Sequence, residues 1–171
     1  GYDKSLDQRT YPGLYNVDQL GFNYRMSELH AAIGVAQLKK FKGFLTKRSL
    51  NFKYLENKLK DLKHISIVPN LKNKLSGSYY CLSIMLSKKI YRKRFEIINF
   101  LKKNGIGSSI YYPHPVPRLK YYKKKYKINK KNFLIASEFS DRIICLPIGP
   151  HVSKKDLDFL ALKLKKYCHS L

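Results

Sequence analysis

The sequence contains no tryptophan, and only 11 of its 171 residues are acidic, against 35 that are lysine or arginine. No apolar run approaches the roughly 18 residues that a membrane-spanning helix needs, so we expect no transmembrane segment. The polar stretch 1–18 lacks the apolar core of a signal peptide, and we therefore expect a cytoplasmic chain. The hydrophobic content of 44% argues against disorder and is typical of a chain with one packed core.

Cysteine is scarce as well. Cys81, Cys145 and Cys168 are odd in number and far apart, and none stands in a C-x-x-C pair. The five histidines are equally dispersed, so the sequence predicts reduced thiols and no metal site.

The formal charge of +24 admits two interpretations. A basic chain of this kind is typical of nucleic-acid binding, and the densest run, Lys120–Lys131, interleaves lysine with three tyrosines that bases could stack on. However, 28 of the 35 cations are lysine, whereas base and phosphate recognition favours arginine. The composition therefore favours a solvated lysine-rich surface, with a basic α+β nucleic-acid-binding module as the alternative.

Apolar residues recur every three or four positions from Met26 to Leu62, which predicts one long amphipathic helix, or two joined near Gly43, with Ser27 as the cap. The rest of the chain predicts short strands alternating with helices: strands at 65–68, 79–86, 106–112 and 143–148, and helices at about 89–103, 133–142 and from Ser153 onward. Three prolines predict irregular structure across 113–118. The predicted order is a long helix followed by β-β-α-β-α-β-α, an α+β arrangement with a small sheet covered by helices.

The most informative segment is LGFNYRMSELHAAIGVAQL at 20–38, where Asn23, Tyr24 and Arg25 precede a helix rich in small residues. This segment resembles the signature that follows the cofactor lysine in the DegT/DnrJ/StrS group of sugar aminotransferases. Three further segments resemble that family in the same order: the GY pair and polar loop at the start, KKNGIGSSIYYPHPVP at 102–117, and SDRIICLPIGPHVSKKDLDFL at 140–160.

The resemblance implies an α/β fold, namely the C-terminal part of the aspartate-aminotransferase-like type I fold that binds pyridoxal 5'-phosphate (PLP). Residues 1–45 are then the end of the large PLP-binding domain and the start of a linking helix, and residues 46–171 are the small C-terminal domain. The family transfers an amino group, typically from glutamate, to a keto-sugar nucleotide in glycan or amino-sugar biosynthesis, and it works as a homodimer. The PLP lysine is absent from this sequence, so we expect the chain alone to be inactive; a non-catalytic remnant is a further alternative.

The resemblance also assigns roles to individual residues. Asn23 is expected to reach the PLP phosphate of the neighbouring subunit, and Arg25 to bind a substrate phosphate or to anchor the same interface; a cap or turn role for Asn23 and an ion pair for Arg25 are the structural alternatives. Tyr111, Tyr112 and His114 are expected to approach the sugar nucleotide, although a solvated His114 is an equal alternative. Many members have histidine at the position of Tyr111, and a second one where this chain has Pro117 or Arg118, so the identity of the sugar stays open.

Overall fold

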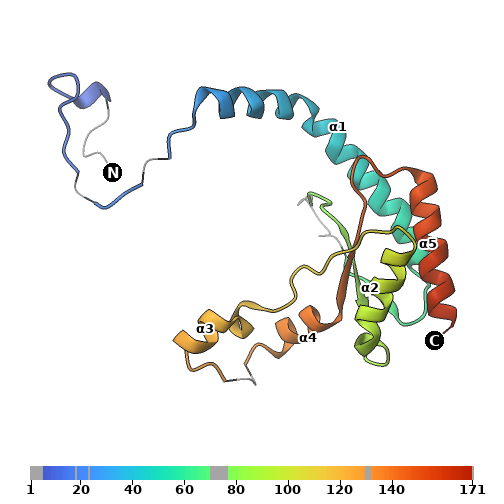
Figure 1. The fold of residues 1–171 in the computed structure, drawn as a ribbon. Helices are drawn as coiled ribbons and strands as arrows, with labels where there is room; N and C mark the ends of the chain where they lie inside the picture. Colours follow the sequence, from blue (N-terminus) through green and yellow to red (C-terminus); the bar gives the residue numbers. More distant parts are fainter. Residues whose placement is uncertain (1–5, 18, 23, 70–76, 130–131, 171) are drawn as a thin grey trace. The chain divides into compact units, whose positions relative to one another are not determined.

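The computed structural model describes residues 6–17, 19–22, 24–69, 77–129 and 132–170 (Figure 1). The chain divides into two compact units, residues 1–40 and 41–171. The first unit contains the short 3-10 helix η1, Leu6–Gln8, and the beginning of helix α1, Glu28–Leu59. Helix α1 runs without interruption through Gly43, which decides between the two expectations for this segment. The Ser27 hydroxyl accepts a hydrogen bond from the backbone N–H of His30 at 3.4 Å, so the predicted cap is confirmed.

The second unit is built on an antiparallel sheet of three strands in the order β1-β2-β3. These are β1 (Ile65–Ile67), β2 (Leu82–Leu86) and β3 (Ile143–Leu146). Side chains of β2 alternate between buried and half-buried, as expected for a strand with one face on the core, whereas all four residues of β3 are buried. The most enclosed strand, β3, therefore lies at one edge of the sheet.

The core lies between this sheet and three helices. Helix α2 (Arg94–Lys103) lies beside helix α5 (Lys154–His169), and the rings of Phe100 and Tyr167 pack with their centroids 5.0 Å apart (Figure 1). The second half of α1 completes the layer with Phe52, Leu55 and Leu59. Burial of such aliphatic side chains contributes on the order of 1.5–3 kcal/mol each, which makes this layer the main source of stability.

Two helix ends follow short sequence signals. Ser153 and Asp156 form a capping box at the start of α5, in which each side chain accepts a hydrogen bond from the backbone N–H of the other residue. Gly105 takes a positive φ of 74° directly after α2, as the Asn104-Gly105 pair predicts. The backbone then turns into the core, where Ile106 is buried.

The predicted strand at 106–112 is wrong. Within this segment only Ser109 pairs with a strand, through two backbone hydrogen bonds to Cys145 at 2.7 and 3.0 Å. The β-prone composition of the segment favours extended backbone, but a strand also needs a partner, and only Ser109 finds one in Cys145.

Two helical turns were also not predicted: the 3-10 turn η3 (Val116–Arg118), inside the stretch expected to be irregular, and helix α3 (Lys120–Lys125). The remaining helix, α4 (Leu134–Arg142), matches its prediction to within one residue. Within the described part of the chain, no helix combines the length and the apolar character needed to cross a membrane.

Candidate functional site

A loop at residues 109–118, which we call the proline loop, links the edge of the sheet to helix α3. Its first residue is held by the Ser109–Cys145 pair described above. Its last residue, Arg118, donates two hydrogen bonds to the Asp141 carboxylate on α4, at 2.6 and 3.0 Å. This bidentate geometry fixes orientation as well as position, so both ends of the proline loop are anchored to other elements.

Helix α4, which faces the proline loop, is itself tied to the sheet. The Arg142 guanidinium donates from Nε to the backbone oxygen of Leu86 in β2 at 2.6 Å, and also contacts Glu138 one turn earlier. Arg94, which is only 8% exposed, donates to the backbone oxygen of Ser140. Burial lowers the pKa of Arg94, while the nearby Asp141 charge opposes that shift. Arg94, from α2, and Arg142, at the end of α4, thus hold helix α4 in place beside the proline loop.

Between the proline loop and α4 lies an apolar cavity of about 1020 Å³. Tyr111, Tyr112 and His114 line it, so the structure brings together three of the residues that the sequence singles out. The Tyr111 ring packs against the rings of Tyr80 and Tyr112, each with centroids 5.6 Å apart. Tyr112 is 72% exposed and leaves its ring available to a ligand. The opposite wall is supplied mainly by α4 and the residue before it: Phe133, Ile135, Ala136, Phe139 and Ser140.

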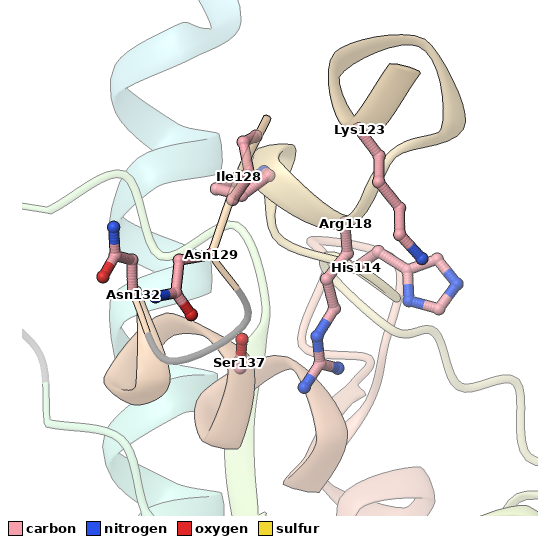
Figure 2. A pocket seen from close by; sticks show the side chains of 8 residues that line it. His114, Arg118, Lys123, Ile128, Asn129, Asn132 and Ser137 are labelled. Atoms are coloured by element: carbon pink, nitrogen blue, oxygen red, sulfur yellow. The ribbon is translucent and has the colours of Figure 1, made fainter. Parts of the chain in front are cut away.

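A second, smaller pocket of about 330 Å³ adjoins the first through His114, which lines both. Figure 2 shows His114, Arg118 and Lys123 on one side of this pocket, and the amides of Asn129 and Asn132 on the opposite side. The Arg118, Lys123 and amide N–H groups are hydrogen-bond donors. Lys123 adds positive charge, whereas the Asp141 carboxylate balances the charge of Arg118. Such a set suits an anionic group such as a phosphate. His114 therefore stands between an apolar space and a polar, cationic one.

The sequence did not identify most of the residues that face the proline loop across these cavities. A signal was present for Ile135 and Phe139, which lie four residues apart on a predicted helix and so share one face. No comparable signal marked Lys123, because it stands in a run of lysines that predicts a solvated surface.

The two other predicted site residues, Asn23 and Arg25, belong to the stretch 1–40 that forms the first unit. Asn23 lies outside the described residues. Arg25 is exposed and belongs to the first unit, where the neighbouring Tyr24 ring packs on Phe22 with centroids 5.7 Å apart. Their expected roles stay predictions.

Lys88 does not have the properties of a cofactor lysine. Ser83 and Lys88 show a spacing that is also found around the PLP lysine of the family, but the Lys88 side chain is 77% exposed and its ammonium lies 3.2 Å from Glu138. An imine-forming lysine must lose its proton, which burial promotes and a carboxylate partner opposes. Lys88 therefore does not fit this role. The described residues also contain no group of three or more His, Cys, Asp or Glu side chains placed to hold a metal ion.

The tyrosines of the lysine-rich run pack against one another in and next to helix α3. The rings of Tyr122 and Tyr126 stack at 12° with centroids 6.2 Å apart, and the Lys125 ammonium lies 5.5 Å from the Tyr126 centroid. A single-strand-binding surface needs ring faces open to bases. Here two of the three rings face one another.

Comparisons with known proteins agree with one another. A sequence model of the DegT/DnrJ/EryC1/StrS aminotransferase family matches residues 3–165. The chain is 32% identical over 129 residues to dTDP-4-amino-4,6-dideoxy-D-glucose transaminase of Escherichia coli, a match that covers 75% of this chain and 34% of that protein. It is 28% identical over 150 residues to GDP-perosamine synthase of Vibrio cholerae, covering 88% of this chain and 40% of that protein.

Solved structures show the same likeness. Helicobacter pylori PseC, an aminotransferase involved in the biosynthesis of pseudoaminic acid, superposes with a TM-score of 0.82 at 23% identity, over 95% of this chain and 43% of that one. The PMP form of the putative sugar aminotransferase Spr1654 from Streptococcus pneumoniae gives a TM-score of 0.81 at 21% identity, over 92% and 39%. The predicted fold class is thus confirmed. The chain spans 34–43% of the length of these four relatives.

Proposed function

The chain belongs to the DegT/DnrJ/EryC1/StrS aminotransferase family, and from this premise we propose that it is the C-terminal portion of a PLP-dependent sugar aminotransferase. The whole enzyme would move an amino group from glutamate to a keto-sugar nucleotide. The observation on which this rests is the family match, which runs from residue 3 to residue 165 and so covers most of both compact units. In such an enzyme the bound PLP supplies the electron sink for the transfer.

Within this portion, the proposed task of the proline loop is to bind the sugar nucleotide. Tyr111 and Tyr112 offer aromatic surface to the apolar cavity of about 1020 Å³, and the adjoining pocket offers donors suited to phosphate oxygens. His114 lines both spaces and is placed to contact the sugar nucleotide where its apolar and anionic parts meet. The anchoring of Arg118 to Asp141 supports this proposal, because a loop fixed at both ends loses little conformational freedom when a ligand binds.

The first unit would act across a homodimer. We assign Asn23 to the PLP phosphate of the neighbouring subunit, since an amide N–H is a suitable donor to a phosphate oxygen. Arg25 is assigned to a substrate phosphate or to the same interface. The corresponding domain boundaries are residues 1–45 for the end of the large domain with the start of the linking helix, and 46–171 for the small domain.

The proposal predicts that the chain by itself does not hold PLP covalently. Lys88 and the other lysines lack the family context of the cofactor lysine, so borohydride treatment after mixing with PLP should leave no stoichiometric modified lysine. The readout is intact mass followed by peptide mapping, with a whole family member as the positive control. One lysine modified in every chain would contradict the proposal and place the cofactor site inside residues 1–171.

A basic nucleic-acid-binding module is the alternative that the charge of +24 keeps open. It requires saturable binding of an oligonucleotide that weakens when Tyr121 and Tyr122 are replaced by alanine. A non-catalytic remnant would give neither result: it would not bind the oligonucleotide, and it would not transfer an amino group after the N-terminal half of the enzyme is supplied.

A further inference from the structure

Two cysteines that are distant in sequence lie beside the same serine. Ser83 in β2 pairs directly with Cys145 in β3, and Cys81 precedes Ser83 by two residues, which places all three side chains on one face of the sheet. The Cys81 and Cys145 sulfurs each lie 3.5 Å from the Ser83 hydroxyl oxygen. This cluster belongs to neither of the two cavities described above.

The cluster opens into a third cavity, of about 440 Å³, in the second unit. Both cysteines line it, together with Arg48 and with Ser109 and Tyr111 from the start of the proline loop. Cys145 is 3% exposed. The cavity has room for a small uncharged oxidant beside both cysteines, although little of the Cys145 side chain is exposed.

The two thiols titrate as a pair. Hydrogen bonds from the Cys81 thiol, then from the Ser83 hydroxyl and the Tyr111 backbone N–H, lower the pKa of Cys145 against the opposing effect of burial. The same thiol–thiol hydrogen bond, followed by burial, raises the pKa of Cys81. The pair thus gives up its first proton readily and its second one with difficulty. A thiolate held next to a thiol is the arrangement that oxidants attack.

We propose that Cys81 and Cys145 form an oxidation site, at which a hydroperoxide converts the two thiols into an intramolecular disulfide. The Cys145 thiolate attacks one peroxide oxygen, the O–O bond breaks and hydroxide leaves, which gives a sulfenic acid on Cys145. The Cys81 sulfur then attacks that sulfur, and the sulfenic oxygen leaves as water. In total two thiols and one hydrogen peroxide give one disulfide and two waters, so the sulfurs are oxidised and the peroxide is reduced.

Closing this bond requires Cys81 to move, because the register places Cys145 opposite Ser83 and makes Cys81 a diagonal neighbour, typically about 7–8 Å away. Strand β2 begins at Leu82, so Cys81 precedes the hydrogen-bonded ladder and can shift without breaking a strand pair. A disulfide needs the two Cβ atoms within about 3.5–4.5 Å of each other. Closure also removes the Cys145 thiolate as acceptor for the Tyr111 N–H, and it thereby couples the oxidation state to the start of the proline loop. The oxidation itself does not depend on the proposed aminotransferase function.

Cys168 is an internal control. It is 6% exposed in the core beside α2, and burial raises its pKa to about 11. It lines none of the three cavities described above. We therefore expect Cys168 to stay reduced under conditions that oxidise the pair.

The test is treatment of the 171-residue chain with a small excess of hydrogen peroxide, followed by non-reducing peptide mass mapping. The expected result is the loss of two hydrogen atoms, one cross-linked peptide pair containing Cys81 and Cys145, and full reversal by dithiothreitol. The variant Cys168→Ser should behave identically. In Cys81→Ser, or in Cys81→Ala if the serine variant melts differently, a dimedone-type probe should trap a sulfenic acid on Cys145.

Two outcomes would overturn the proposal. One is oxidation of Cys145 in the unaltered chain to sulfenic or sulfinic acid without any link to Cys81. The other is a reaction no faster at the pair than at Cys168.

Discussion

Replacing Asn51 by leucine is expected to destabilise the chain by about 2–3 kcal/mol, the cost of leaving buried carbonyl groups without hydrogen bonds. Asn51 lies on α1 and is only 3% exposed. Its side-chain amide donates to the backbone oxygens of Ile148, Gly149 and Val152 at 3.1–3.3 Å. Leucine fills a similar volume but donates nothing, so the turn between β3 and α5 loses its tie to α1.

Urea denaturation, followed by circular dichroism, measures the change in the free energy of unfolding. In a separate thermal melt, the midpoint should fall by roughly 4–12 °C for a chain of this size. Asn57→Leu is the matched control, because Asn57 lies on the exposed face of the same helix. Its stability should stay within about 0.5 kcal/mol of the original. Equal effects of the two substitutions would show that the amide of Asn51 does not hold the turn.

The Asn23→Ala substitution is expected to weaken PLP binding by roughly 10–150-fold in the whole enzyme that the proposed function implies. A hydrogen bond to a charged group contributes about 1.5–3 kcal/mol, and each 1.4 kcal/mol is a factor of ten in affinity. The effect should appear in the dissociation constant of PLP, measured by fluorescence titration of the apo dimer.

Asn16→Ala serves as the control, because Asn16 lies in the same unit and its side-chain oxygen accepts a hydrogen bond from the neighbouring Val17 N–H at 2.8 Å. Mixed dimers add a second readout. If Asn23 reaches across the interface, pairing an Asn23→Ala subunit with an intact one should weaken binding at one of the two sites. An unchanged PLP affinity in the homodimeric variant would return Asn23 to the role of a turn or cap residue.

Helices with local signals could be predicted from the sequence because their determinants lie within a few residues of each other. The Ser153–Asp156 capping box spans four positions, and the Asn104-Gly105 stop spans two. Strand 106–112 failed for the opposite reason. Its composition favours extended backbone, but a strand also needs a partner, and only Ser109 finds one in Cys145.

The residues of the candidate site also differ in whether the sequence identifies them. Tyr111, Tyr112 and His114 were identified through the family resemblance, and they do line one cavity. Lys123 and Asn132, which line the adjoining pocket with His114, could not be identified from sequence, because no local pattern links positions 114, 123 and 132. Asn51 shows the limit most clearly, since its three acceptors lie 97–101 residues further along the chain. A helix-face pattern contains no information about them.

Transfer of labelled nitrogen tests the central claim most directly. The whole enzyme, with this chain as its C-terminal portion, is incubated with PLP, nitrogen-labelled glutamate and a set of keto-sugar nucleotides, and the products are resolved by mass spectrometry. The account predicts that the label appears in an amino-sugar nucleotide, together with 2-oxoglutarate in equal amount. A PLP-loaded enzyme that leaves all the label on glutamate with every keto-sugar nucleotide would contradict it.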